Sequence, residues 1–140
     1  MKDYVVEQLN DPNDKDMADV LNLFKEIPGR TCTAAKYLDY LNTNWLLVAL
    51  FIVRTNGDIV GFTQAEAPNQ LDPECAWLPY SHALPQCPHK QSEKAVELAI
   101  EWMRGFGATK FKCHTVRNVE AFGRLWKMKR SPEVLMEKDI

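Results

Sequence analysis

The chain has 140 residues, and its hydrophobic share of 46% and charged share of 26% are typical of one globular domain, expected here over residues 1–140. A formal net charge of −2, from 17 basic and 19 acidic side chains, excludes a strongly basic nucleic-acid surface. The charged N-terminus lacks a signal-peptide core, and the longest apolar run, residues 45–53, is about half a membrane span. We therefore expect a cytoplasmic protein that binds neither nucleic acid nor membrane.

The first part of the chain predicts a short strand followed by two helices. Apolar residues alternate over Tyr4–Gln8, as in a half-buried strand. Asn10-Asp11-Pro12 is typical of a helix start, with a capping residue and a proline in the first turn. Apolar side chains then recur at helical spacing as far as Pro28-Gly29, which ends the helix. A second helix is expected over Thr31–Leu41.

The middle of the chain predicts three consecutive strands. The continuous apolar run Trp45–Arg54 is typical of a strand that is buried on both faces. Asn56-Gly57 follows it and indicates a tight hairpin turn, because both positions of that turn need positive φ. Ile59–Ala65 is the expected partner strand. Cys75–Leu84 predicts a fourth strand, in which Pro79 removes a ladder donor and implies an edge, a bulge or a splayed end.

The last part predicts a helix, a strand, a helix and a final strand. Ser92 is the expected cap of a helix that runs to Phe106, with Gly107 at its C-terminal end. Lys110–Thr115 is the fifth expected strand, Asn118 begins a further helix, and Glu133–Glu137 forms the last strand. This order predicts an α/β fold with a mixed, largely antiparallel central sheet and helices on both faces.

The order of the elements resembles the GCN5-related N-acetyltransferase (GNAT) family over nearly the whole chain, and three stretches carry the resemblance. They are the hairpin LLVALFIVRTNGDIVGFTQAEA, the helix and strand SEKAVELAIEWMRGFGATKFKCHT, and the ending NVEAFGRLWKMKRSPEVLMEKDI. The resemblance implies an acyl-CoA N-acyltransferase-like fold. It also implies an acetyl-CoA or other acyl-CoA cosubstrate, whose arm lies between splayed fourth and fifth strands and whose diphosphate lies at the start of the third helix.

The resemblance assigns candidate residues to the cosubstrate. They lie in three places. These are the backbone of the fourth strand (Ala83, Leu84), the entry to the third helix (His89, Lys90, Gln91, Ser92) and the fourth helix (Asn118, Arg124, Lys127). The family's loop carries glycines that residues 86–93 lack, so Lys90 and Ser92 would have to hold the phosphates. The alternative is that Ser92 is only a helix cap and Lys90 a solvated charge.

The implied reaction transfers the acyl group from the thioester to an amine, and it needs a base. The candidates are Glu66, Glu74, Tyr80 and His82 on or beside the third and fourth strands. The alternatives are that Glu66 and Glu74 are ordinary solvated residues at strand ends and that His82 is a structural histidine. A tyrosine that serves as the acid in the family aligns with Leu125.

Two functions follow from these residues. The first is an acyl-CoA-dependent N-acyltransferase that acts on a small-molecule or protein amine, as a monomer or homodimer. The second is a catalytically degenerate protein of the same fold that serves as a binding or structural module, for instance in a phage or mobile element. An unrelated α/β binding domain is a third reading. No metal is expected, because the cysteines and histidines match no paired-ligand spacing, and the four cysteines are expected as free thiols.

Overall fold

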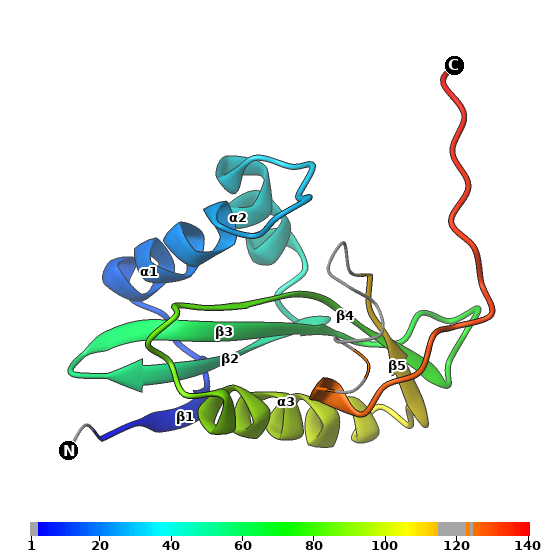
Figure 1. Cartoon of the computed structure of the whole chain (residues 1–140). Helices are drawn as coiled ribbons and strands as arrows, with labels where there is room; N and C mark the ends of the chain where they lie inside the picture. The colour runs from blue at the N-terminus through cyan, green and yellow to red at the C-terminus, as the bar shows by residue number, and fades with distance from the viewer. Residues whose placement is uncertain (1–2, 115–122, 124) are drawn as a thin grey trace.

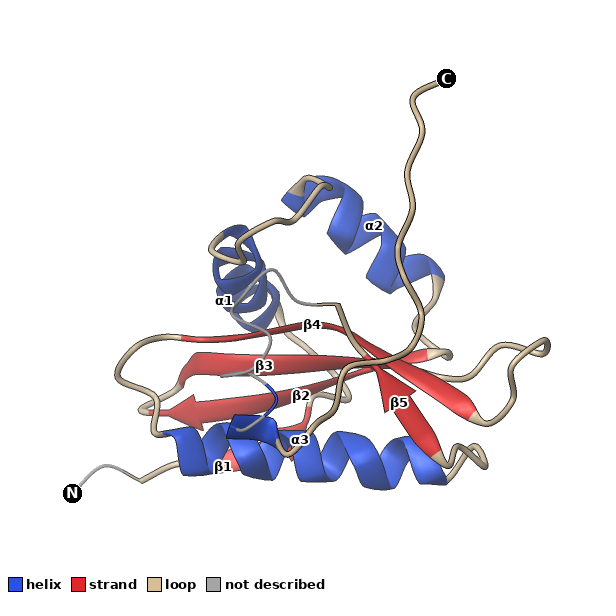
Figure 2. Ribbon diagram, turned by 45° about the vertical axis from the view of Figure 1, so that its right-hand side comes forward, coloured by secondary structure: helices blue, strands red, loops and turns tan. Residues whose placement is uncertain are grey.

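A computed structural model describes residues 3–114, 123 and 125–140, and it contains one open sheet between two helical layers (Figures 1 and 2). The elements in chain order are β1 (Val5–Gln8), α1 (Asp14–Lys25), α2 (Ala34–Thr43), β2 (Val48–Thr55), β3 (Asp58–Glu66), β4 (Cys75–Ala83), α3 (His89–Arg104) and β5 (Lys110–Lys112). The sheet order is β1-β2-β3-β4-β5; the first four strands are antiparallel, and β5 is parallel to β4. Helices α1 and α2 cover one face and α3 covers the other, which confirms the predicted fold class.

The strand β2 lies at the centre of both cores. Seven of its eight residues are buried, because successive side chains point to opposite faces and both faces carry helices. Leu50 and Ile52 pack with Val20, Phe24, Tyr37 and Leu41 under α1 and α2. Ala49, Phe51 and Val53 pack with Ala95, Ala99 and Met103 of α3. The apolar run in the sequence is therefore confirmed as a doubly buried strand.

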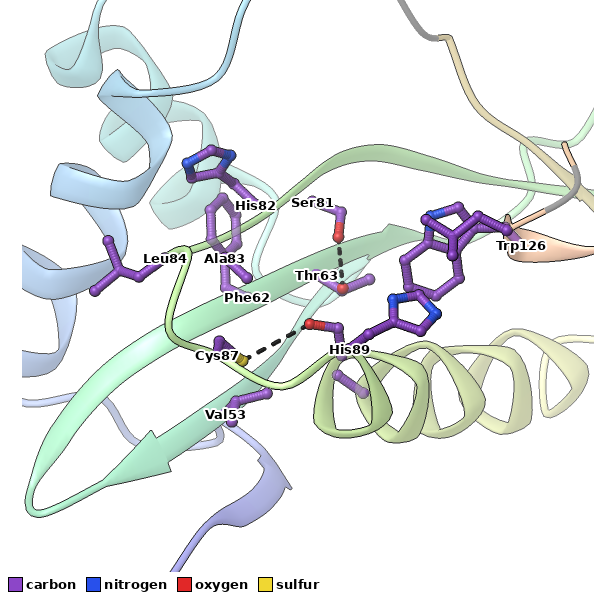
Figure 3. Close-up of a pocket in the computed structure, with 13 residues that line it drawn as sticks. Val53, Phe62, Thr63, Ser81, His82, Ala83, Leu84, Cys87, His89 and Trp126 are labelled. Atoms are coloured by element: carbon purple, nitrogen blue, oxygen red, sulfur yellow. Dashed lines mark hydrogen bonds between the residues drawn. The ribbon is translucent and has the colours of Figure 1, made fainter. Parts of the chain in front are cut away.

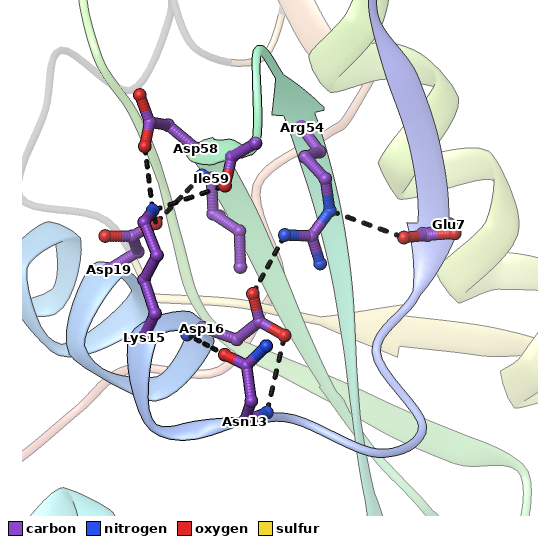
Figure 4. A network of polar contacts seen from close by, with 9 residues as sticks. Glu7, Asn13, Lys15, Asp16, Asp19, Arg54, Asp58 and Ile59 are labelled. Atoms are coloured by element: carbon purple, nitrogen blue, oxygen red, sulfur yellow. Dashed lines mark hydrogen bonds and ion pairs between the residues drawn. The ribbon is translucent and has the colours of Figure 1, made fainter.

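Helix α1 begins later than its sequence signal predicts. Asn13, not the Asn10-Asp11-Pro12 segment, is the N-cap, and its side chain accepts a hydrogen bond from the backbone N–H of Asp16 in a capping box. The Asp16 carboxylate also accepts a hydrogen bond from Arg54 on β2, at 2.8 Å (Figure 4). The N-cap that forms, Asn13, is thus the one whose capping-box partner, Asp16, also bonds to the sheet through Arg54.

The two local irregularities predicted in the sheet are both present. Asn56 and Gly57 have φ angles of 50° and 79°, as the tight β2–β3 turn requires. Between β3 and β4 the register shifts from Gln64 opposite Tyr80 to Glu66 opposite Trp77, so β4 contains a bulge that includes Pro79. A bulge removes the need for the N–H that proline lacks.

The bounds of α3 differ from the prediction at both ends. The helix begins at His89 with Pro88 as its N-cap, so Ser92 lies in the first turn and is not the cap. The cap that ends α3 is Gly105, and the chain turns away two residues later at Gly107, whose φ is 88°. Proline is well suited to open a helix because it has no N–H to satisfy.

The C-terminal elements also differ from the prediction. Strand β5 ends at Lys112, before the expected Thr115, which lies outside the described residues. The predicted fourth helix falls largely outside them too, although Gly123, Leu125 and Trp126 are helical. The predicted strand Glu133–Glu137 is wrong: among the described residues this segment pairs with no strand, and its three apolar side chains are more than 80% exposed. Apolar β-formers make a strand only where a ladder partner is available.

Candidate active site

The strands β4 and β5 separate after three paired residues. Cys75, Ala76 and Trp77 lie opposite Lys110–Lys112, and β5 then ends. The rest of β4, Leu78–Ala83, has no neighbour on that side within the described residues. Glu66 on β3 lies opposite Trp77, in the row at which the opening begins.

The register of β3 and β4 decides which backbone groups face this opening. Leu84 donates its N–H to the carbonyl oxygen of Val60 at 2.8 Å, so Leu84 is not available as the donor that the resemblance suggests. Antiparallel pairs alternate between bonded and non-bonded. Ala83, opposite Gly61, and Ser81, opposite Thr63, are therefore in non-bonded pairs, and their N–H groups point away from β3 into the opening. The Ala83 N–H therefore has the direction that the predicted backbone donor needs. The Ser81 N–H, which the sequence did not suggest, has the same direction.

The N-terminus of α3 closes one end of the opening. Pro88 supplies no side-chain cap, and the N–H groups of Gln91 and Ser92 donate to its carbonyl at 3.0 and 3.4 Å. Lys90 in this turn is exposed. An uncapped helix start with a lysine beside it has the charge that favours an anion.

A cavity of about 230 Å³ lies between this helix start and β4 (Figure 3). Five of the residues singled out in the sequence line it: His82, Ala83, Leu84, His89 and Ser92. The Ser92 hydroxyl lies 3.8 Å from the buried Cys87 Sγ, and the Ser81 and Thr63 hydroxyls are 2.9 Å apart. Lys90 and Gln91 belong to the same helical turn but do not line the cavity.

Aromatic side chains form the outer rim of the cavity. The Trp126 ring packs against the His89 ring with centroids 4.8 Å apart, and His89 Nε2 is 2.8 Å from the Glu93 carboxylate. Trp126, whose place on a helix face is typical of a core residue, is instead half-buried and lines this cavity. Lys127, the next residue, is exposed. The other two helix candidates, Asn118 and Arg124, lie outside the described residues.

A line of polar side chains runs through the opposite face of the sheet to Glu66. Tyr37 donates its hydroxyl to Gln64 Oε1 at 2.5 Å, and Gln64 Nε2 donates to Glu66 Oε1 at 3.2 Å. The Tyr40 hydroxyl donates to the same Glu66 oxygen. Burial, with the Glu66 hydrogen bond second, raises the pKa of Tyr40 well above its ordinary value, so its hydroxyl is a donor at any working pH.

The other three candidate bases occupy different surroundings. Tyr80 packs edge-on against Phe24 and Tyr37, and burial raises the pKa of its hydroxyl. The Nε2 atom of His82 lies 3.2 Å from a carboxylate oxygen of Glu26 at the end of α1. Its Nδ1 is buried without a hydrogen-bond partner among the described residues. Glu74 precedes β4, where its side chain is exposed. Of the four candidates, Glu66 and Tyr80 belong to one cluster.

The sequence analysis missed Tyr37, Tyr40 and Gln64. A signal for them exists: Gln64 is a large polar residue between Thr63 and Ala65 inside a strand that is buried along most of its length, and it is fully buried. A buried amide needs partners for its donors and acceptors, so it indicates a polar network. The two tyrosines, three residues apart on α2, share one helix face and supply that network.

Two further features of the described residues bear on the site. Residues 3–114, 123 and 125–140 hold no group of three or more metal-ligating side chains. In the same ranges, no helix is long and apolar enough to cross a membrane.

Comparison with known proteins identifies the fold. No protein-family model matches the sequence, and no curated protein matches it. The aminoglycoside N-acetyltransferase AAC(6')-Iy in complex with CoA superposes with a TM-score of 0.76 at 14% identity, covering 99% of this chain and 96% of that one. The ribosomal-protein-alanine N-acetyltransferase of Brucella melitensis gives 0.70 at 11% identity, covering 99% and 100%. The glucosamine-6-phosphate N-acetyltransferase of Arabidopsis thaliana gives 0.66 at 12%, covering 98% of each chain.

These likenesses establish the fold at low identity. The chain has the architecture of the GNAT N-acetyltransferases, as its sequence predicts.

Proposed function

We propose that this protein is an acyl-CoA-dependent N-acyltransferase that transfers an acyl group to an amine. The observation that carries the proposal is the opening between β4 and β5. The N–H groups of Ser81 and Ala83 point into it with no strand partner among the described residues, and the uncapped start of α3 closes it. Glu66 lies in the row where the opening begins, on the strand next to β4. Solved structures of the same fold include one in complex with CoA, which supports this use of the opening.

The residues present fit an acyl-CoA with one adjustment. Backbone donors line the opening, and Lys90 with the helix start suits a diphosphate. The cavity of about 230 Å³ is somewhat smaller than the roughly 300–1,000 Å³ usual for ligand sites. The Trp126 side chain on the rim must therefore turn away from His89. When bound, the acyl-CoA supplies a thioester whose carbonyl carbon accepts an amine.

Glu66 is the residue that we propose holds the amine and takes its proton. Both hydrogen bonds to its carboxylate end on Oε1, which leaves Oε2 for the amine within the described part of the chain. The neutral tyrosines around it keep the carboxylate oriented without adding charge. Leu125 cannot donate a proton, so the thiolate leaves without help from that position. General acid catalysis contributes about 10²–10⁴-fold, so this step lowers the rate without preventing transfer.

The first experiment measures the melting temperature with and without acetyl-CoA. Ligand at about 100 times its dissociation constant adds about 2.7 kcal/mol of stability. The variant Lys90→Glu should bind about tenfold more weakly or worse, since a nearby repulsion replaces an attraction. Lys36→Glu makes the same charge reversal in the first turn of α2 and should bind as the wild type does.

The outcomes separate the two functions. Release of free CoA thiol in the presence of an amine supports the acyltransferase. Binding without thiol release over a broad amine panel supports a binding module that retains the fold. If acetyl-CoA produces no thermal shift at millimolar concentration, the proposed site is wrong.

A further inference from the structure

The acceptor side of the site combines one carboxylate with three neutral tyrosines. Glu66 contacts Tyr40 directly and Tyr37 through Gln64, while Tyr80 packs against the Tyr37 ring at 5.3 Å. Among the described residues, Glu66 is the one carboxylate that hydrogen-bonds this cluster. It forms no ion pair with a lysine, arginine or histidine in those residues. The cluster therefore has one negative charge available to a ligand.

The surface beside this carboxylate is apolar. Val48 lies opposite Glu66, and Ala67 donates its N–H to the carbonyl oxygen of Leu47 at 2.9 Å, so the α2–β2 connection runs alongside the end of β3. Leu47 is 57% exposed and Leu46 is 89% exposed. Tyr40 on α2, 39% exposed, donates its hydroxyl to Glu66 itself. Exposed apolar side chains mark a binding surface where several of them gather in one patch.

We infer that the acceptor is an amine with one positive charge on an apolar or aromatic body. Its ammonium group binds Glu66 Oε2, and its body lies against Tyr40 and Leu47. This inference rests on the proposed function, because it names the acceptor of that same site. A polyamine or an amino sugar with several ammonium groups would bring charges that this surface does not pair, and unpaired charges are costly to desolvate.

The test compares four small probes by calorimetric titration into the full-length wild-type protein saturated with CoA. 2-Phenylethylamine has both the charge and the body, ethylamine has only the charge, 2-phenylethanol has only the body, and spermidine has several charges. We expect 2-phenylethylamine to bind at least about tenfold more tightly than each of the other three. Equal or tighter binding of spermidine, or of ethylamine, would overturn the inference.

Variants then locate the site. Glu66→Gln keeps the shape of the side chain, and it should reduce 2-phenylethylamine affinity by about tenfold or more. Glu97→Gln, the same change at an exposed position on α3, should leave it unchanged. If Glu66→Gln binds the amine as the wild type does, the inference is wrong even where the probes rank as expected.

The two proposals fail in different ways. Repeating the titrations without CoA shows whether the amine site exists by itself. Amine selectivity without an acetyl-CoA thermal shift would contradict the acyltransferase and leave the amine site standing. A thermal shift together with a preference for spermidine would contradict only the choice of acceptor.

Discussion

The two faces of the sheet hold their polar groups in different ways. Under α1 and α2, side chains bond to side chains: Tyr37 to Gln64, Gln64 to Glu66, and Arg54 to Asp16 (Figure 4). Beside the start of α3, two short side-chain pairs, Ser81–Thr63 and Ser92–Cys87, line the cavity together with backbone amides and an uncapped helix end. On the α1–α2 face, hydrogen bonds hold a few side chains in fixed directions. Beside α3, backbone N–H groups are the donors, and the strand pairing of the sheet sets the direction in which they point.

The difference predicts what substitutions do on each face. On the α1–α2 face, a changed side chain removes a specific partner and should alter chemistry or stability. On the α3 face, the amides survive most substitutions, so changes there should alter the affinity for the cosubstrate by smaller factors. The following three variants test this contrast in order of expected effect.

The largest effect is expected at Glu66. Glu66→Gln keeps hydrogen bonds to Tyr40 and Gln64 but removes the proposed base, so kcat/KM for amine acetylation should fall by about 10²–10⁴-fold. The acetyl-CoA thermal shift should be unchanged, because the proposed cosubstrate site lies between β4 and the start of α3, away from the Glu66 carboxylate. Steady-state thiol release measures kcat/KM, and a melting curve measures the thermal shift. A fall of less than threefold would remove Glu66 from the mechanism.

The next effect is expected on stability, at Asp16. Its side chain is 8% exposed and accepts hydrogen bonds from Arg54 and the backbone N–H of Asn13. Asp16→Asn should lower the free energy of unfolding by about 1–3 kcal/mol in urea denaturation, because Arg54 loses its short charged hydrogen bond and keeps the longer Glu7 contact at 3.6 Å. The exposed Lys15–Asp58 pair is the control, and Asp58→Asn should cost less than about 1 kcal/mol.

This effect should depend on pH in a defined direction. The Arg54 hydrogen bond lowers the pKa of Asp16 below its ordinary value of 3.8. The pair therefore stabilises the fold above that pH, and its contribution is lost as pH falls through the lower folded value. The gap between wild type and Asp16→Asn should narrow in acid. A gap that is constant from pH 7 to pH 3 would show that the charge is not the cause.

The smallest effect is expected at the rim of the cavity. Trp126→Ala removes the ring that packs on His89, so the cosubstrate no longer has to displace it. The acetyl-CoA affinity should then rise by about threefold in a calorimetric titration. Without the state in which the ring packs on His89, a larger fraction of the protein is ready to bind. Leu71→Ala, at an exposed side chain that does not line the cavity, is the control. Weaker binding by Trp126→Ala would instead show that this ring contacts the cosubstrate.

Much of the fold was predictable because its signals are local. The apolar run of β2, the Asn56-Gly57 turn and the bulge at Pro79 each follow from the chemistry of a few neighbouring residues, and the structure confirms all three. The start of α1 was not predictable to the residue. Two capping segments compete there, and the contact between Asp16 and Arg54, 38 residues apart, accompanies the one that forms.

The sequence by itself determined the order of the elements from β1 to β5, the two-sided burial of β2 and the loop that leads into α3, since periodicity and turn chemistry act over short distances. Only the tertiary structure decided that the backbone N–H of Ala83, and not that of Leu84, points into the opening, because that depends on the register against β3. It also joined Tyr37 to Gln64 across 27 residues and left the segment at 133–137 unpaired. Hydrogen-bond partners that are distant in the chain are chosen by packing, which local sequence does not encode.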